Sequence, residues 1–158
     1  MNRLISQLIQ HEGVRGNYYQ CTANKKTIGV GRNVDDHPFN ADELKYLGRK
    51  DFTHVAMTLK EAEWLLVRDV DKCELQLLNS GVVEGLSGLT EARKAVCVNM
   101  VYNIGIRGFC KFKNMLKALN QSDFKKASLE MLDSKWAKQV GNRAVELSTQ
   151  MYLGEFDD

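Results

Sequence analysis

The sequence predicts an α+β protein that is mostly helical, because segments of two different periodicities follow one another along the chain. Near the N-terminus, aromatic or β-branched residues occur at Tyr18, Tyr19, Thr27, Ile28 and Val30, and turn residues occur at Asn24, Gly29 and Gly31. From residue 58 onward, apolar residues recur at helical spacing. We therefore expect a small antiparallel hairpin sheet near the end of a first helix, followed by a helical remainder.

The first helix is predicted to end at Glu12. Gly13 follows directly and is a residue type that often terminates helices. Such a helix end directs the Glu12 carboxyl toward the glycine-rich turn that holds Cys21 and Thr27, so these three side chains can share one site. The apolar residues that carry the helical pattern are Leu4, Ile5, Leu8 and Ile9.

Further helices are predicted from caps and apolar spacing. Thr58 and Glu61 form a capping box that opens a long helix, which stops at residues 79–81. Residues 91–104 are apolar on almost every side, as in a buried central helix. A short helix is expected at 40–47, in a polar segment after Pro38. Amphipathic helices, several with Ser or Asn as the N-cap, are expected at 112–119, 122–132, 134–139 and 142–151.

Composition allows one or two small subdomains with their own cores. The chain has 158 residues, of which 44% are hydrophobic, so it needs no disulfide or metal to fold. Its 22 basic and 20 acidic residues are too balanced to indicate a nucleic-acid protein. The four cysteines lack paired spacing, which favours reduced thiols over a zinc site. Cys73 and Cys97 lie in helical patterns, whereas Cys21 lies in a polar loop, where we expect a reactive or polar role.

Glu12, Cys21 and Thr27 also carry a family resemblance. The motif is a glutamate, then an aspartate or cysteine after eight intervening residues, then a threonine after five more. This order resembles that of the lysozymes of T-even and related bacteriophages, glycoside hydrolase family 24. The Ile-Gly-Val-Gly that begins at Ile28 matches as well. Three more blocks fit in the same order: TLKEAEWLLVRDVD from Thr58, RKAVCVNMVYNIG from Arg93, and SKWAKQVGNRA from Ser134.

The resemblance implies a single lysozyme domain over residues 1–158 with two lobes. The lysozyme-like fold has a small antiparallel β-sheet lobe and a C-terminal helical lobe joined by a long helix. In this chain the α+β lobe would be 12–57, the connecting helix 58–80, and the helical lobe 1–11 plus 81–158. The substrate cleft of the family lies between the lobes.

The implied activity is that of an N-acetylmuramidase. Such an enzyme hydrolyses the β-1,4 bond between N-acetylmuramic acid and N-acetylglucosamine in peptidoglycan, with no cofactor or metal. Glu12 would be the acid that protonates the departing oxygen. Cys21 stands where most members have an aspartate that positions or deprotonates a water, and Thr27 would hold that water. Cys21 can act as base, water-positioning group or nucleophile, so inverting and retaining outcomes both remain open.

A thiol with an ordinary pKa of about 8.5 is mostly neutral at pH 7, so the surroundings of Cys21 matter. Lys25 and Lys26 lie in the same loop and would favour the thiolate if their ammonium groups approach it.

The resemblance also assigns supporting residues. Arg143 would orient Glu12, and Arg32, at a position where many members have histidine, would pair with Asp69 on the connecting helix. Tyr102, Gln139 and Asn142 would bind substrate at the cleft, with Trp136 in the core. Met115 and Glu130 stand where family members can present small or amide side chains to substrate.

Residues 1–13 have a broken apolar pattern, which predicts neither a signal peptide nor a membrane anchor. The resemblance implies a monomer made in the host cytoplasm that reaches a Gram-negative cell wall through a separate holin.

Two other interpretations of the sequence compete with an active lysozyme. One is a lysozyme fold that binds peptidoglycan without cutting it. The other is a helical nucleic-acid or regulatory protein. Its support is the lysine cluster of Lys111, Lys113 and Lys117, but such a cluster is more typical of a solvated helix face.

Overall fold

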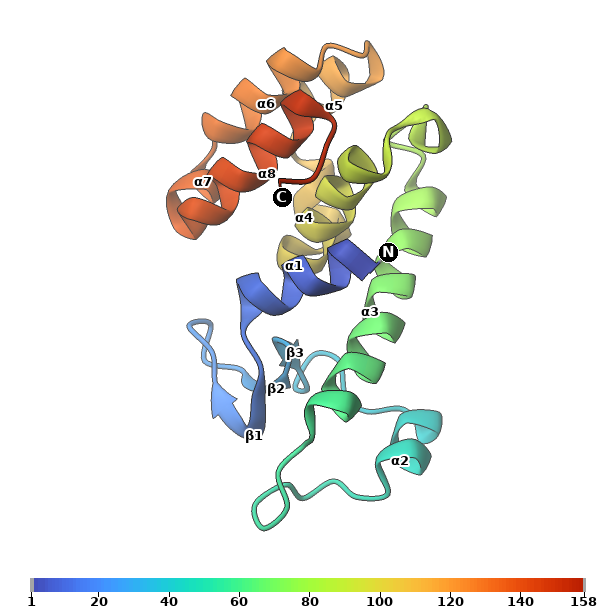
Figure 1. Ribbon diagram of the computed structural model, residues 1–158, viewed down its shortest axis with the longest axis vertical. Helices are drawn as coiled ribbons and strands as arrows, with labels where there is room; N and C mark the ends of the chain where they lie inside the picture. Colours follow the sequence, from blue (N-terminus) through green and yellow to red (C-terminus); the bar gives the residue numbers. More distant parts are fainter. Residues whose placement is uncertain (1, 158) are drawn as a thin grey trace. The chain divides into compact units, whose positions relative to one another are not determined.

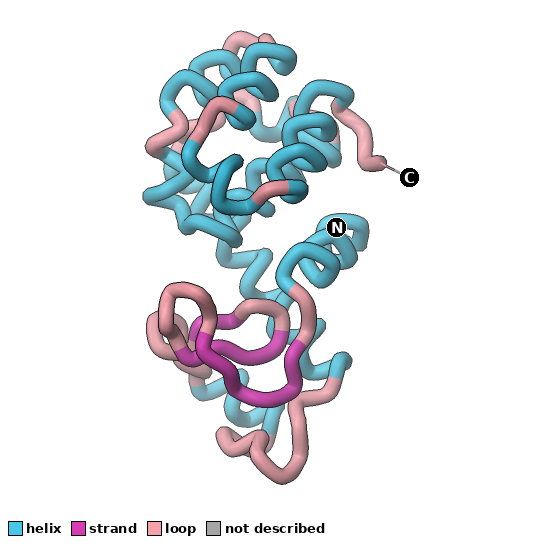
Figure 2. Tube along the Cα trace, turned by 90° about the vertical axis from the view of Figure 1, so that its left-hand side faces the viewer, coloured by secondary structure: helices cyan, strands magenta, loops and turns pink. Residues whose placement is uncertain are grey.

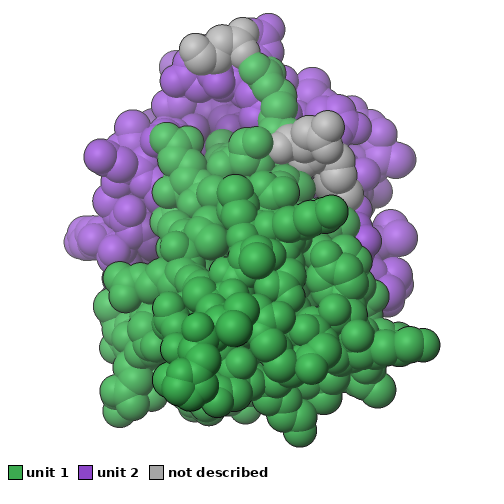
Figure 3. Space-filling model, turned by 60° about the horizontal axis from the view of Figure 1, so that its bottom comes forward, with its two compact units in different colours: residues 1–69 green, residues 70–158 purple. Residues whose placement is uncertain are grey.

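The computed structural model describes residues 2–157 and confirms the α+β, mostly helical fold. The chain forms two compact units, residues 1–69 and residues 70–158 (Figure 3). The long helix α3 (Leu59–Ser80) begins in the first unit and continues into the second (Figure 1). The predicted sub-lobes 12–57, 58–80 and 1–11 plus 81–158 stay a prediction. No helix within residues 2–157 combines the length and the apolar character needed to cross a bilayer.

The first unit begins with helix α1 (Asn2–Glu12), whose bounds confirm that the helix ends at Glu12. The Gly13 amide donates to the Ile9 carbonyl oxygen at 2.8 Å, with Gly13 at φ +74°. Glycine reaches this left-handed conformation at little cost. Leu4 and Leu8 are 2% and 0% exposed, so the predicted apolar side of the helix is buried.

Three antiparallel strands follow in the order β1-β2-β3 (Figure 2). They are β1 (Arg15–Gln20), β2 (Lys26–Gly29) and β3 (Arg32–Asn33). Tyr19 lies opposite Thr27, and Ile28 lies opposite Arg32. The register shifts between Arg15 and Tyr19, where the strand is irregular.

At Gly16, the irregular part of β1 lies directly against the backbone of Met57. A Cβ at this position would lie 2.7 Å from the Met57 carbonyl oxygen, which is too close for any side chain. The Met57 amide donates to the Gly16 carbonyl oxygen at 2.8 Å. Glycine therefore allows the backbone of β1 to meet the segment that leads into α3.

Capping boxes begin both remaining helices of the first unit. In α2 (Ala41–Leu47), Asn40 and Glu43 exchange side-chain-to-backbone hydrogen bonds of 2.9 and 3.0 Å. At the start of α3, Thr58 and Glu61 do the same at 3.1 and 2.9 Å, as predicted. The core of this unit includes Ile28, Leu47, Phe52, Leu65 and Leu66.

The second unit is helical. Helix α6 packs against α5 and α8, and α8 also contacts α4 and α7 (Figure 1). Helix α4 is the buried central element, as its apolar pattern predicted. The elements are the 3-10 helix η1 (Leu86–Gly88), α4 (Glu91–Cys110), α5 (Lys113–Asn120), α6 (Phe124–Leu132), α7 (Lys135–Val140) and α8 (Asn142–Leu153).

Three details of this unit differ from the prediction. Helix α4 runs to Cys110 rather than residue 104, through a kink at Gly105 with φ +76° and ψ 163°, because helical hydrogen bonding resumes after that glycine. Asp123, not Ser122, caps α6. Helix α8 has Gly141 as its N-cap and no side-chain cap, so the predicted Asn cap is wrong there. Ser134 does cap α7, as expected.

Candidate active site

The Glu12 carboxyl lies against the backbone of the turn between β2 and β3. A Cβ built at Gly31 would lie 2.8 Å from Oε2 of Glu12 and 3.2 Å from its Cδ. Gly31 also has φ +67°, which favours glycine on conformational grounds. Glu12 itself is half-buried. The glycine therefore leaves the room that the carboxyl occupies.

Thr27 is fixed inside the sheet. It is 2% exposed, and its hydroxyl donates to the Lys25 carbonyl oxygen at 2.9 Å. The same carbonyl oxygen accepts the Cys21 amide at 3.0 Å. Thr27 and Cys21 thus share one backbone acceptor in the loop that connects β1 to β2.

Cys21 begins this loop and is half-exposed. The Asn24 amide donates to the Cys21 carbonyl oxygen at 2.8 Å, and Asn24 adopts φ +61° to close the turn. The backbone amide of Lys25 and then the Thr27 hydroxyl lower the pKa of the Cys21 thiol, more than partial burial raises it. The loop therefore favours the thiolate.

The Thr27 hydroxyl has one hydrogen and two acceptors within reach, the Lys25 carbonyl oxygen and the Cys21 sulfur. A charged acceptor forms the stronger hydrogen bond, so a thiolate would compete with the Lys25 carbonyl oxygen for this hydrogen. The Lys25 carbonyl oxygen keeps its bond from the Cys21 amide in either case. The Thr27 hydroxyl can therefore follow the charge of Cys21.

The lysines of the loop act differently from the expectation. The ammonium group of Lys25 lies 3.4 Å from Oδ1 of Asp36, and that of Lys26 lies 4.1 Å from the ring centroid of Tyr18. Lys25 lowers the Cys21 pKa through its backbone amide. Fixed amide dipoles, rather than the expected ammonium charges, stabilise the thiolate.

Tyr19 joins the three candidate residues, although the sequence indicated only its strand propensity. It pairs across the sheet with Thr27. Burial raises the pKa of the Tyr19 hydroxyl most, Arg15 lowers it, and the charges of Glu12 and Cys21 raise it further. Both candidate groups are therefore within electrostatic range of one phenol. Its position two residues before Cys21 in a strand-like stretch could have indicated a shared face.

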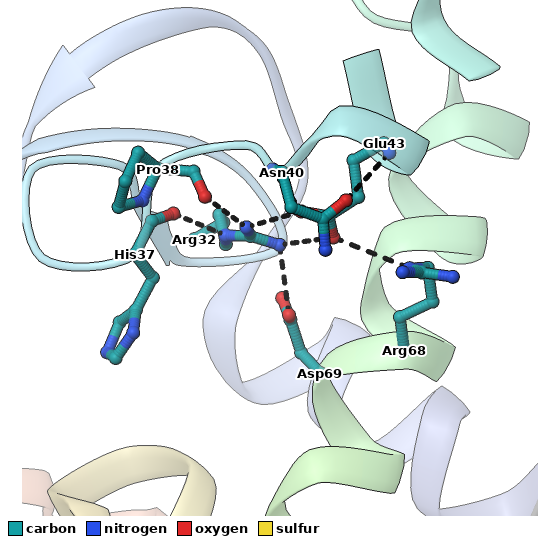
Figure 4. A network of polar contacts seen from close by, with 7 residues as sticks. All are labelled: Arg32, His37, Pro38, Asn40, Glu43, Arg68 and Asp69. Carbon is teal, nitrogen blue, oxygen red and sulfur yellow. Dashed lines mark hydrogen bonds and ion pairs between the residues drawn. The ribbon is translucent and has the colours of Figure 1, made fainter. Parts of the chain in front are cut away.

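Behind the hairpin, Arg32 forms the predicted ion pair with Asp69, with Nη1 and Oδ1 2.9 Å apart (Figure 4). The sequence did not indicate the second partner, Glu43, whose two carboxylate oxygens lie 2.9 and 3.0 Å from the guanidinium. Burial lowers the Arg32 pKa, but Glu43 and Asp69 together outweigh it and raise the pKa.

The network around Arg32 also uses backbone and a second arginine. Arg32 donates to the carbonyl oxygens of His37 at 2.9 Å and Pro38 at 3.1 Å, and Nε of Arg68 lies 3.5 Å from Glu43 (Figure 4). These contacts tie β3 to α2 and α3. They hold the sheet that carries Thr27.

In the second unit, Arg143 is 9% exposed and donates to Oδ1 of Asn99 from Nε at 3.0 Å and from Nη2 at 2.8 Å. Asn99 is fully buried in α4. Asn99 was not predicted from the sequence, although an amide inside the otherwise apolar run 96–101 was a usable signal. The role of Arg143 in orienting Glu12 stays a prediction.

The remaining candidates lie in the second unit. Trp136 is 5% exposed and its Nε1 donates to Oδ1 of Asn103 at 2.7 Å, which confirms its place in the core. Gln139 and Asn142 are exposed and Tyr102 is half-buried, so their substrate-binding roles stay predictions.

Met115 and Glu130 differ in exposure. Met115 is 1% exposed in α5, so its side chain belongs to the helical core, and the effect of this departure from the family on substrate binding stays a prediction. Glu130 is half-buried in α6.

The structure therefore combines a helix-rich fold with an acidic residue at the end of α1 and a thiol and a hydroxyl in the adjoining sheet region. No group of three or more His, Cys, Asp or Glu side chains in residues 2–157 is arranged to hold a metal ion. The family model for phage lysozyme matches residues 9–150. The chain belongs to the phage lysozyme family, and so to the lysozyme class of glycoside hydrolases.

Several relatives are similar over most of this chain. An endolysin of Acyrthosiphon pisum secondary endosymbiont phage 1 is 30% identical over 84% of this chain and 76% of its own length. A probable T4-type lysozyme of Dictyostelium discoideum is 25% identical over 91% and 90%. The pre-baseplate central spike protein Gp5 of Enterobacteria phage T4 is 26% identical over 98% of this chain, which spans only 28% of that protein.

Proposed function

We propose that this protein is an endolysin-type N-acetylmuramidase, which hydrolyses the β-1,4 bond between N-acetylmuramic acid and N-acetylglucosamine in peptidoglycan and so lyses a bacterial host. The observation that carries the proposal is the grouping of Glu12, Cys21 and Thr27 around Tyr19 and Gly31 in a chain of the phage lysozyme family. Glycoside hydrolysis requires an acid and a second functional group close to one another, and Glu12 and Cys21 can supply these.

In the proposed reaction, Glu12 transfers its proton to the glycosidic oxygen as the bond between that oxygen and the anomeric carbon breaks. A water attacks the anomeric carbon, and its proton passes to the Cys21 thiolate. The products are two shorter glycans, a Glu12 carboxylate and a Cys21 thiol. Exchange of one proton with solvent, from the thiol to the carboxylate, restores both groups.

Thr27 supports a water-mediated step over direct attack by sulfur. Its hydroxyl can donate to the thiolate while an oxygen lone pair accepts from the attacking water. Attack by water gives inversion at the anomeric carbon, whereas attack by sulfur would give a thioglycosyl intermediate and overall retention. Anomeric analysis of the first product distinguishes the two mechanisms.

The test is reducing-end release from purified Gram-negative peptidoglycan by the wild type, Glu12→Gln and Cys21→Ser. We expect both substitutions to lower kcat by at least about 100-fold, the size of a general acid or base contribution. Each variant must keep the wild-type unfolding transition for the comparison to count. Equal release by wild type and Glu12→Gln would remove Glu12 from the mechanism.

The second candidate function is a lysozyme-fold module that binds peptidoglycan without cutting it, because a thiol occupies the place of the usual carboxylate. The observation that favours it is the half-exposed thiol itself. It predicts that the wild type sediments with cell walls but releases no sugar, and that Cys21→Asp creates activity.

The relatives suggest two settings, since one is an endolysin and another a spike protein. We propose the endolysin setting, with a monomer that reaches the wall through a holin. Cytoplasmic expression in a Gram-negative host should then cause lysis only after the inner membrane is permeabilised. Lysis without permeabilisation would rule out dependence on a holin.

A further inference from the structure

Arg15 stands apart from the other arginines of the first unit whose contacts are described. Arg32 contacts Glu43 and Asp69, and Arg49 contacts Glu61 at 2.9 Å. Arg15, like Arg32 and Arg49, lies over an aromatic ring, with its Cζ 4.4 Å from the Tyr19 centroid. Within residues 2–157 its guanidinium meets no carboxylate, and the residue is exposed.

The strand geometry places this guanidinium beside the candidate site. Arg15 begins β1, three residues after Glu12, and pairs with Gly29 of β2. The ring beneath it belongs to Tyr19, the partner of Thr27. The Arg15 guanidinium therefore stacks on a ring that belongs to the same hairpin as Cys21.

A guanidinium over an aromatic face keeps its N–H donors available at its edge. That fork matches a carboxylate in shape and charge and can bind it with two parallel hydrogen bonds. Stacking also restricts the side chain before any ligand arrives, which lowers the entropy lost on binding.

The negative charge of the candidate site bears on what the Arg15 guanidinium does. The proposed mechanism places a thiolate at Cys21 when the substrate binds, and that charge repels an anionic substrate. The peptides that peptidoglycan carries on its muramic acid units bear free carboxylates. A cation with no carboxylate partner near the hairpin offsets that repulsion and raises the local concentration of the substrate.

We infer that Arg15, stacked on Tyr19, forms an anion subsite of the proposed lysozyme that binds a carboxylate of the peptide carried by peptidoglycan. The inference rests on the proposed function, because it names a part of the substrate of that same site. It makes Arg15 a specificity-determining residue rather than a catalytic one.

The test compares two forms of one substrate. Soluble glycan strands that carry uncrosslinked peptides are used either untreated or after carbodiimide coupling to ammonia, which converts the carboxylates to neutral amides. We expect Arg15→Gln to raise KM about 3- to 10-fold on untreated strands with kcat unchanged, as for loss of one exposed charge-assisted contact. On amidated strands the change in KM should be less than about 2-fold on the same grounds.

Lys26→Gln is the matched control, because Lys26 is also an exposed cation over a tyrosine of the same sheet, 4.1 Å from the Tyr18 centroid. It removes the same charge, and we expect the same KM as wild type on each substrate. Arg15→Lys keeps the charge but loses the fork, so its KM on untreated strands should lie between those of wild type and Arg15→Gln.

Three outcomes would overturn the inference: equal effects of Arg15→Gln on both substrates, a fall in kcat without a rise in KM, or an equal loss in Lys26→Gln. Binding of both strand types to Glu12→Gln supplies a second readout that needs no turnover. A wild type that binds untreated strands better than amidated ones through Arg15, but cuts neither, would refute the proposed hydrolysis and leave the anion subsite standing.

Discussion

Arg32 and Glu43 form a two-pronged ion pair whose side chains are 4% and 0% exposed, with both carboxylate oxygens about the same distance from the guanidinium at 2.9 and 3.0 Å. A pair this buried contributes little to the free energy of unfolding compared with a well-packed apolar replacement. Removing one partner, however, leaves the other charge buried without its counter-charge. The pair therefore matters more for holding β3 in one position than for net stability.

We expect Glu43→Gln to lower the free energy of unfolding by about 3 kcal/mol, because the amide keeps the shape but leaves Arg32 with Asp69 alone as its anionic partner. Urea denaturation measures this. The matched control is Glu61→Gln, which breaks the two-pronged pair with the more exposed Arg49 and should cost far less. Equal losses in the two variants would contradict the role of burial.

The thiol of Cys21 should react with iodoacetamide at lower pH than an ordinary thiol. The Lys25 amide and the Thr27 hydroxyl lower its pKa, whereas burial raises the pKa of Cys97 to about 12 and should keep that thiol unreactive. Mass spectrometry of the labelled peptides gives the rate at each pH. Thr27→Val should move the Cys21 midpoint upward, because it removes a donor to sulfur.

The lowered pKa of Cys21 also makes the stability of the folded protein depend on pH. The folded state favours the thiolate, so the contribution is present above the ordinary thiol pKa and is lost as the pH falls through the lowered folded value. A midpoint for Cys21 at or above that of a small-molecule thiol would contradict the thiolate-stabilising loop.

Cys21→Asp should shift the acidic limb of the kcat/KM profile to lower pH, if Cys21 is the base. A carboxyl ordinarily ionises near pH 4 and a thiol near pH 8.5, so an aspartate stays charged where an ordinary thiol is neutral. The measurement is reducing-end release between about pH 3 and pH 9, a range that spans these reference values. An acidic limb that does not move would show that ionisation of residue 21 does not control the rate.

Gly31→Ala should reduce activity by more than its effect on folding explains. The added Cβ lies 2.8 Å from Oε2 of Glu12 and displaces the carboxyl, while the φ of +67° adds about 1 kcal/mol of backbone strain.

Gly48→Ala separates these two causes. Gly48 has nearly the same φ, +69°, but a Cβ there meets nothing within 4 Å. It should lose similar stability, measured by urea, and keep wild-type kcat. If the two variants are equally active, the contact between Gly31 and Glu12 has no catalytic consequence.

Several elements of the fold could be predicted because their causes are local in the chain. The end of α1 follows from Gly13, the start of α3 from the capping box of Thr58 and Glu61, and the burial of α4 from its apolar pattern. The extension of α4 past Gly105 could not, since a glycine in a helical pattern indicates either a stop or a kink. Phe109 in the next turn is fully buried, and this packing favours the kink over a stop.

For the site, the sequence by itself determined which residue types are available and in what order: a glutamate at a helix end, then a thiol, then a strand hydroxyl. Tertiary structure alone decided what surrounds them. Backbone amides rather than lysine side chains favour the Cys21 thiolate, Tyr19 links Thr27 to Glu12 and Cys21, and Glu43 joins the expected pair of Arg32 and Asp69. The physical reason is that periodicity and caps depend on neighbours a few residues apart, whereas burial and electrostatics depend on groups that only folding brings together.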